Sequence, residues 1–255
     1  MLSPKSMKPV LAAILLLLAA CGGTTVVEDD AQPQPNEIAG MSTVFIGMGT
    51  WENQRRTNYW VNGGVVIQIE DGVSTILSVA HFCDEVKQDE SEDITVVTTV
   101  FDMEGNPHKA TVVDYDRSID LCLITVESEW EAVTTRLLAP SAIELWDPLE
   151  NYSNPTGTRV GQRLLLSGNT RARYPEYQAL FRYDGYYAGV YNEIVAANSM
   201  PVTGGQSGSG VFLDGALIGV VSQGETDFHH ILFSVRGDVI NEWLLEHGVE
   251  MEYVE

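Results

Sequence analysis

Three short segments carry side chains suited to nucleophilic catalysis. In chain order they are Ser78-Val79-Ala80-His81, Asp120-Leu121-Cys122-Leu123 and Gly204-Gly205-Gln206-Ser207-Gly208-Ser209-Gly210. A serine hydroxyl is a weak nucleophile until a positioned base takes its proton, and an imidazole held in one tautomer by a carboxylate is such a base. We therefore assign Ser207 as nucleophile, His81 as general base and acid, and Asp120 as the carboxylate that orients His81.

The glycines around Ser207 have a separate chemical purpose. A tetrahedral intermediate carries an oxyanion, which needs preorganised hydrogen-bond donors. Backbone N–H groups converge on one point only in conformations that glycine readily adopts. We expect the N–H groups of Gly205 and Ser207 to form the oxyanion hole.

Each motif alone has an ordinary structural explanation. A glycine-rich serine segment is a common turn, and a histidine at a strand end is commonly structural. Asp114 and Asp116 compete with Asp120 for the orienting role. Asp120 is preferred because it directly precedes the apolar residues 121–126, which are typical of a buried strand. The joint occurrence of the three motifs in one order favours catalysis.

The elements that must hold these residues are mostly strands. Short β-branched runs bounded by Gly, Asp and Asn predict strands over residues 61–69, 74–79, 93–101, 110–113 and 160–167. Asp214-Gly215 between two apolar runs predicts a β-hairpin. Residues 238–247 show helical periodicity, with Val239, Ile240, Trp243 and Leu244 on one face. The pattern predicts an all-β domain closed by a C-terminal helix.

The N-terminus resembles a secretion signal. Lys5 and Lys8 precede the 12 apolar residues 9–20, a stretch shorter than the roughly 20 residues that span a bilayer. Leu18-Ala19-Ala20-Cys21 resembles the bacterial lipobox, in which the cysteine is lipidated and becomes the new N-terminus. The alternatives are an ordinary signal peptide or a weak membrane anchor. Residues 21–41 lack periodicity and are expected to be a flexible tether.

Charge restricts the partners of this chain. The net charge is −22, and removal of residues 1–20 leaves 12 basic against 36 acidic side chains, or −24. Such a protein repels nucleic acid and anionic surfaces, so we expect no nucleic-acid partner. The ten residues 84–93 are strongly acidic, and we expect a solvated loop there rather than a calcium site. His229 and His230 lack clear partner ligands, so we predict neither a metal nor a cofactor.

The three motifs together resemble those of trypsin/chymotrypsin-type serine endopeptidases, in their bacterial glutamyl-endopeptidase-like and HtrA-like branches. The segments around His81, Asp120 and Ser207 are similar to the family's Thr-Ala-Ala-His, Asp-Leu-Ala-Leu and Gly-Asn-Ser-Gly-Ser. The resemblance covers roughly residues 42–247. It implies a chymotrypsin-like double six-stranded β-barrel, with a first barrel at about 42–135, a second at about 155–236 and a C-terminal helix at about 238–247, all within a protease domain of residues 42–255.

The resemblance also implies function. It predicts a serine endopeptidase that cleaves protein or peptide substrates through an acyl-enzyme, exported and lipid-anchored through Cys21 in a bacterial cell envelope, either periplasmic or outward-facing. The family's counterpart of Ser222-Gln223-Gly224 pairs with the substrate backbone, so these three residues are expected to bind substrate.

Three positions depart from the family pattern. Gln206 stands where animal digestive members have the aspartate that pairs with a freshly cut N-terminus, so that activation route is absent. Val221 replaces the histidine of glutamyl-specific members, and Pro201 replaces the aspartate of trypsin-like members. The resemblance therefore predicts neither a glutamate nor a basic preference.

Cys83 and Cys122 lie two residues after His81 and Asp120, respectively. If His81 and Asp120 are hydrogen-bonded, the two cysteines must also be close in space. A disulfide is the expected state in an exported protein, and two buried free thiols are the alternative.

Two other functions remain open. An α/β-type hydrolase needs Gly-x-Ser-x-Gly and the order Ser, Asp, His, whereas here Ser209 replaces the last glycine and the order is reversed. A catalytically silent binding or envelope lipoprotein with a protease fold would keep the same motifs. Labelling by a fluorophosphonate distinguishes it from an enzyme.

Overall fold

The structure is a computed structural model in which most described residues form β-strands. Cys21, the signal segment, the tether and residues 139–162 lie outside the described residues. The described ranges are 42–53, 55–89, 94–102, 105–127, 133–138, 163–170, 179–202, 204–225 and 230–254. None of the helices in these ranges is long and apolar enough to cross a membrane.

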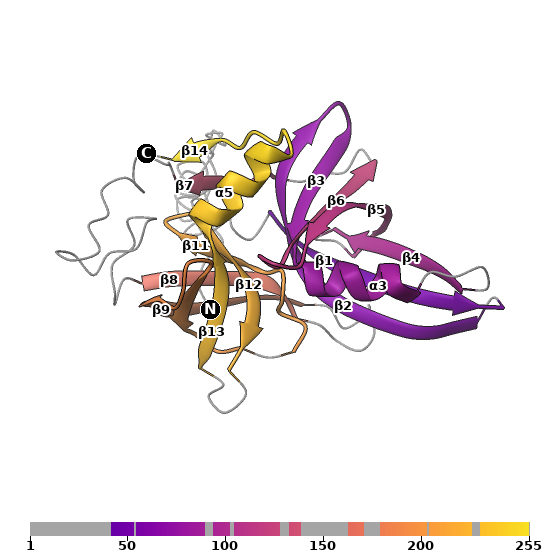
Figure 1. Cartoon of the computed structure of the whole chain (residues 1–255), viewed down its shortest axis with the longest axis horizontal. Helices are drawn as coiled ribbons and strands as arrows, with labels where there is room; N and C mark the ends of the chain where they lie inside the picture. The colour runs from indigo at the N-terminus through magenta and orange to yellow at the C-terminus, as the bar shows by residue number, and fades with distance from the viewer. Residues whose placement is uncertain are drawn as a thin grey trace, which may run out of the picture. The chain divides into compact units, whose positions relative to one another are not determined.

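The first half of the domain is a closed six-stranded barrel with the strand order β1-β2-β3-β6-β5-β4 (Figure 1). Asp71 and Gly72 join β2 to β3 with φ of 50° and 79°, the left-handed pair that a tight two-residue hairpin requires. The strands are β1 (Thr43–Glu52), β2 (Arg55–Glu70), β3 (Val73–Ser78), β4 (Ile94–Phe101), β5 (Pro107–Asp116) and β6 (Leu121–Glu127).

The second half is an eight-stranded sheet with the order β11-β8-β9-β10-β13-β12-β7-β14. An additional pairing of β11 with β12 joins the two ends of the six-strand run β11-β8-β9-β10-β13-β12, which closes it into a ring. Asp214 and Gly215 have φ of 48° and 83°, which confirms the hairpin predicted there. The strands are β7 (Arg136–Leu138), β8 (Arg163–Thr170), β9 (Ala179–Val190), β10 (Val195–Ser199), β11 (Gly210–Leu213), β12 (Ala216–Gly224), β13 (Ile231–Arg236) and β14 (Tyr253–Val254).

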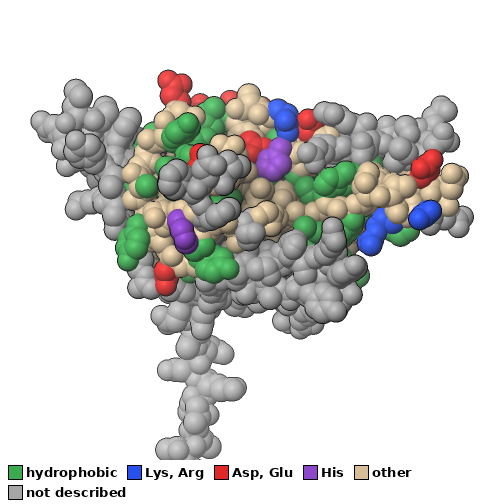
Figure 2. All heavy atoms as spheres, turned by 90° about the horizontal axis from the view of Figure 1, so that it is seen from below, with side chains coloured by type: hydrophobic (Ala, Val, Ile, Leu, Met, Phe, Trp, Pro, Cys, Tyr) green, Lys and Arg blue, Asp and Glu red, His purple; other side chains and the backbone are tan. Residues whose placement is uncertain are grey.

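The architecture is therefore the chymotrypsin-like double barrel expected from the motifs. A continuous buried core explains why the strands close as they do. It includes Ile46 and Ile124 from the first barrel, Val220 from the second and Trp243 from the C-terminal helix. On the face in Figure 2, acidic, basic and hydrophobic side chains are interspersed, with the hydrophobic ones at several separate places.

Two helices complete the described part of the chain. Helix α3 (Ala80–Asp89) follows β3 directly, so residues 84–89 are helical rather than the solvated loop predicted for residues 84–93. The acidic composition concealed this helix, in which Ala80, Phe82 and Cys83 are buried among the side chains that the structure describes. Helix α5 (Gly237–Glu246) packs on β12 and β13 and buries Ile240, Trp243 and Leu244, three of the four predicted apolar residues.

His247, at the end of α5, connects the two barrels. Its Nδ1 lies 2.7 Å from the carbonyl oxygen of Trp243, and its Nε2 lies 2.9 Å from the Asp114 carboxylate on β5. Both ring nitrogens can donate at once only when the imidazole is protonated. The bond to the Trp243 carbonyl, supported by Asp114, accordingly raises the pKa of His247 against the opposing effect of burial.

This contact makes a testable contribution to stability. A histidine with a raised pKa in the folded state stabilises fully below its unfolded pKa of about 6.5, and the benefit is lost as pH rises through the folded value. His247→Gln should therefore lower the free energy of unfolding by about 1 kcal/mol at pH 5.5 and by less at pH 9. Urea unfolding at both pH values measures this. An equal loss at both would mean that ring packing on Trp243, rather than charge, stabilises the helix end.

Candidate active site

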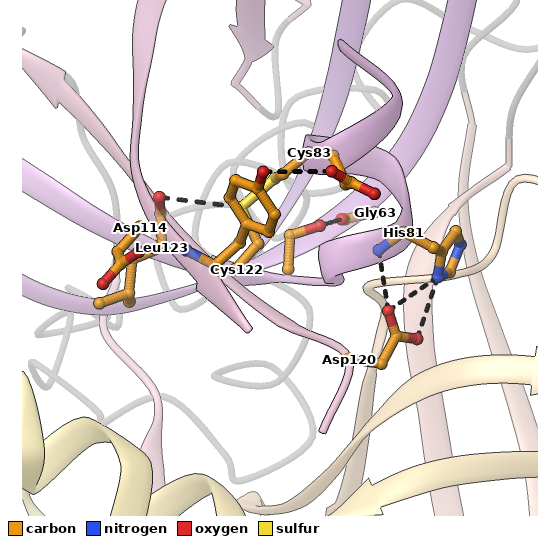
Figure 3. Close-up of a disulfide and its surroundings, with 10 residues drawn as sticks. Gly63, His81, Cys83, Asp114, Asp120, Cys122 and Leu123 are labelled. Carbon is orange, nitrogen blue, oxygen red and sulfur yellow. Dashed lines mark hydrogen bonds and ion pairs between the residues drawn. A yellow bond between two sulfur atoms is a disulfide. The ribbon is translucent and has the colours of Figure 1, made fainter. Parts of the chain in front are cut away.

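His81 and Asp120 meet at one end of the first barrel. Asp120 accepts the backbone N–H of His81 at 2.9 Å, and both carboxylate oxygens lie 3.0 Å from His81 Nδ1. Figure 3 shows the carboxylate facing the imidazole ring. The side chains are 36% and 21% exposed, respectively. The carboxylate thus holds the ring with Nδ1 protonated, which leaves Nε2 as the basic nitrogen.

The backbone at Asp120 is unusual. Residues 117–120 form a turn before β6, and Asp120 has a φ of +58°, a conformation that Asp and Asn tolerate better than other side chains. Burial raises the pKa of Asp120, but hydrogen bonds from His81 and Ser222 outweigh it and hold the pKa below its usual range. Asp120 therefore remains ionised at neutral pH, and its contacts are weakened only when pH falls through that lowered value.

The two competing aspartates have other tasks. Asp114 accepts the N–H of Tyr115 at 2.8 Å and contacts His247. Asp116 accepts both the N–H and the hydroxyl of Ser118 at 2.7 Å, which stabilises the turn. Of the three carboxylates, only that of Asp120 contacts His81 in the described residues.

The serine segment forms an open loop between β10 and β11. Gly205 and Gly208 have φ of +88° and +83°, which the sequence reasoning had anticipated for this glycine-rich stretch. Ser209 N–H donates to the Gln206 carbonyl at 3.0 Å and Gly208 N–H to Val221 at 2.7 Å. Within the described residues, the N–H groups of Gly205 and Ser207 donate to no protein oxygen. These two donors are available to an incoming oxyanion.

A backbone contact ties this loop to the first barrel. Gly63 on β2 donates its N–H to the Ser207 carbonyl at 2.8 Å, and its own carbonyl accepts the Ser78 hydroxyl at 2.9 Å. A β-carbon on Gly208 would lie 2.1 Å from the Gly63 carbonyl oxygen, so only glycine permits this approach. Sequence reasoning missed the role of Gly63, for which the Gly63-Gly64 pair inside a strand was the available signal.

Ser222 links the nucleophile and the orienting carboxylate. Its hydroxyl donates to Asp120 Oδ2 at 2.5 Å, and its carbonyl accepts the hydroxyl of Ser207 at 3.3 Å. In the described residues, no hydrogen bond joins Ser207 to His81. Sequence reasoning assigned Ser222 to substrate binding alone, because nothing in its local sequence reveals a contact with a residue 102 positions away.

The three residues expected to bind substrate lie at the end of β12. Gln223 and Gly224 pair with Phe233 and Leu232 of β13 on one side. On the other side, pairing with β11 ends at Gly210↔Val220, and Val221 makes the last backbone contacts, with Gly208 and Ser209. Among the described strands, none covers this edge beyond Val221. An extended peptide can therefore add to it by backbone hydrogen bonding.

A disulfide joins Cys83 to Cys122 beside the His81–Asp120 pair (Figure 3). Cys83 lies on α3, which carries His81, and Cys122 lies on β6, which follows Asp120. Both residues are fully buried. The covalent bond therefore fixes the two elements that position the base and its carboxylate.

Removal of this disulfide should destabilise the domain. Cys83 and Cys122 are 39 residues apart, and cross-linking a loop of that length lowers the entropy of the unfolded chain by the equivalent of about 4 kcal/mol. We expect the Cys83→Ala/Cys122→Ala double variant to lose about that much free energy of unfolding in urea titrations. Wild-type protein unfolded with a thiol reductant should behave like the variant, and a loss below about 1 kcal/mol would contradict the expectation.

The described residues contain no group of three or more His, Cys, Asp or Glu side chains arranged to hold a metal ion. His230 is exposed, and its neighbour His229 lies outside the described residues, as do residues 90–93 of the acidic segment.

Comparison with known proteins identifies a family for this chain. A family model described as "Trypsin-like peptidase domain" matches residues 63–220, which include His81, Asp120 and Ser207. No curated protein was found to be significantly similar in sequence.

Solved structures of the Rv3671c protease from M. tuberculosis have a similar fold. Its inactive form superimposes with a TM-score of 0.55 at 17% identity, covering 84% of this chain and 93% of that one. Its active form gives 0.55 at 18% identity, with 85% of each chain covered. At such low identity the likeness concerns the fold alone.

Proposed function

Since the chain belongs to the trypsin-like peptidase domain family, we propose that it is a serine endopeptidase that cleaves peptide bonds through an acyl-enzyme. One observation carries the proposal: the first barrel holds His81 against an ionised Asp120, and Ser222 connects that carboxylate to the Ser207 loop of the second barrel. These are the parts that activate a serine hydroxyl.

The first half of the reaction forms the acyl-enzyme. His81 Nε2 takes the proton of Ser207 as Oγ bonds to the substrate carbonyl carbon. The carbonyl π electrons move onto oxygen, and the negative charge is met by the N–H groups of Gly205 and Ser207. The imidazolium then gives its proton to the leaving amine as the C–N bond breaks.

The second half hydrolyses the ester. Water attacks the acyl carbon while His81 removes its proton, and the C–Oγ bond breaks as Ser207 regains a proton from His81. Asp120 remains ionised throughout, because its role is to orient and stabilise the imidazolium. No cofactor is needed.

The Ser207 hydroxyl must turn before it reacts. Its hydrogen bond to the Ser222 carbonyl is long, at 3.3 Å, and rotation about the Cα–Cβ bond between staggered positions moves Oγ away from that carbonyl. Catalytic hydrogen bonds commonly tighten only when substrate is bound. Substrate pairing along Ser222–Gly224 would compete for the same strand edge and favour this rotation.

Covalent labelling tests the proposal. Purified residues 22–255 are treated with a fluorophosphonate, and the intact mass and tryptic peptides are measured. One adduct, mapped to Ser207 rather than Ser209, is expected. A folded protein that takes up no label would contradict the proposal and favour the silent binding lipoprotein.

We further propose that the protein is exported and anchored in a bacterial envelope by lipid on Cys21. The supports are the charged and apolar leader and the lipobox-like Leu18-Ala19-Ala20-Cys21. Mass spectrometry of the N-terminal peptide should show diacylglycerol on Cys21. An unmodified Cys21, or cleavage elsewhere, would contradict lipid anchoring without affecting the proposed chemistry.

A further inference from the structure

Val202 fills the space beside the strand edge at which a substrate would bind. Gly224 is exposed at the end of β12, and an ideal β-carbon on it would lie 2.7 and 3.0 Å from the two γ-carbons of Val202. The two residues are therefore in direct contact, and the space beside them is narrow.

The position of this contact relates it to the nucleophile. The register with β13 shifts between Val221 and Gln223, so Gly224, opposite Leu232, lies on the same face of β12 as Val221, opposite Ser234. Val221 in turn makes backbone hydrogen bonds with Gly208 and Ser209, the two residues after the nucleophile. Val202 precedes Ser207 by five residues and leads into the serine loop. The segment that leads to Ser207 and the end of β12 thus meet at Val202 and Gly224.

Val202 is not free to move aside. It is only partly exposed, and it packs against the second hydrophobic cluster of the domain, which includes Met200, Val221 and Leu232. A branched side chain held by such packing has few alternative rotamers. The space beside Gly224 is consequently limited by a rigid apolar group.

From these contacts we infer that Val202 restricts cleavage to peptides with a small, uncharged side chain on the residue whose carbonyl Ser207 attacks. This inference rests on the proposed endopeptidase function. When a peptide pairs with Ser222–Gly224 and places its carbonyl carbon at Ser207, that side chain must fit between β12 and the segment at Val202.

Charge complements the limit on size. Residues 200–202 and 222–224 include no charged side chain. A carboxylate or guanidinium on the substrate would lose hydration there without gaining an ionic partner, which is unfavourable. Alanine and glycine at this position of the substrate satisfy both conditions.

The test uses tetrapeptide p-nitroanilides that differ only in the residue before p-nitroaniline: Gly, Ala, Leu, Phe, Glu or Arg. We expect the wild type to have its highest kcat/KM with Ala or Gly, at least about tenfold above Phe. An extra methylene group that a pocket cannot hold commonly lowers kcat/KM by about tenfold or more. Val202→Ala should shift the Phe/Ala ratio of kcat/KM by about tenfold or more towards Phe.

Two further variants serve as controls. Val190→Ala removes the same atoms from an exposed valine on β9 and should leave the ratio unchanged. Gly224→Ala adds a carbon to the crowded space and should lower kcat/KM for the Ala substrate relative to the Gly substrate, so the inference is tested even if Val202→Ala fails to fold.

The outcomes separate this inference from the proposed function. A protein that is labelled on Ser207 but prefers Phe, Glu or Arg, or whose Phe/Ala ratio is unchanged by Val202→Ala, overturns the inference alone. A protein that neither takes up fluorophosphonate nor cleaves any substrate overturns the proposed function, and the inference falls with it.

Discussion

Ser207→Ala is expected to lower kcat for peptide hydrolysis by about 10⁶-fold, the usual cost of removing the nucleophile from a serine protease triad. The residual rate would come from the Gly205 and Ser207 N–H groups and from substrate binding, both of which an alanine retains. The loop should keep its fold, because Ser207 uses backbone groups for its contact with Gly63. Progress curves with the best p-nitroanilide substrate measure the loss.

Ser209→Ala is the matched control for this experiment. Ser209 lies in the same loop and is fully buried, and its hydroxyl has no hydrogen-bond partner in the described residues. Removal of an unpartnered buried hydroxyl is neutral or stabilising, so kcat should change less than about threefold. Equal losses for the two variants would show that the loop is merely sensitive to substitution and would count against Ser207 as nucleophile.

Asp120→Asn should lower kcat by about 10⁴-fold. The asparagine oxygen can still accept the His81 backbone N–H, but its amide N–H would then face His81 Nδ1. That arrangement favours the tautomer with the proton on Nε2, which cannot act as a base. Asparagine also tolerates the φ of +58°, so the backbone is preserved better than with alanine. The measurement is kcat at pH 7 to 8, with thermal unfolding to verify the fold.

Asp116→Asn is the control for a change from Asp to Asn close to the site. Asp116 ends β5 directly before the same turn, and an asparagine oxygen can still accept hydrogen bonds from Ser118. Its kcat should remain within about twofold of the wild type. A loss of only tenfold for Asp120→Asn would mean that His81 does not depend on this carboxylate for its tautomer, and the assignment of Asp120 would be wrong.

Local sequence was sufficient for much of the fold. Short β-branched runs bounded by Gly, Asp and Asn located β2, β3, β4, β5 and β8, since such side chains pack well on a pleated sheet and the bounding residues favour turns. Asp214-Gly215 predicted its hairpin because few other residue pairs adopt the required positive φ values. The apolar face of α5 likewise followed from helical periodicity. Helix α3 was missed, because its acidic residues resemble a solvated loop and its buried contacts come from strands elsewhere in the chain.

For the site, the sequence by itself determined which side chains were suited to catalysis and which glycines permitted the serine loop. Only the tertiary structure decided how they meet: Ser222 contacts Asp120 across 102 residues, Gly63 donates to the Ser207 carbonyl, and Val202 lies against Gly224. The physical reason is that motifs and turns depend on the conformational preferences of adjacent residues. Contacts between the barrels depend instead on how closed sheets pack together, which no short segment encodes.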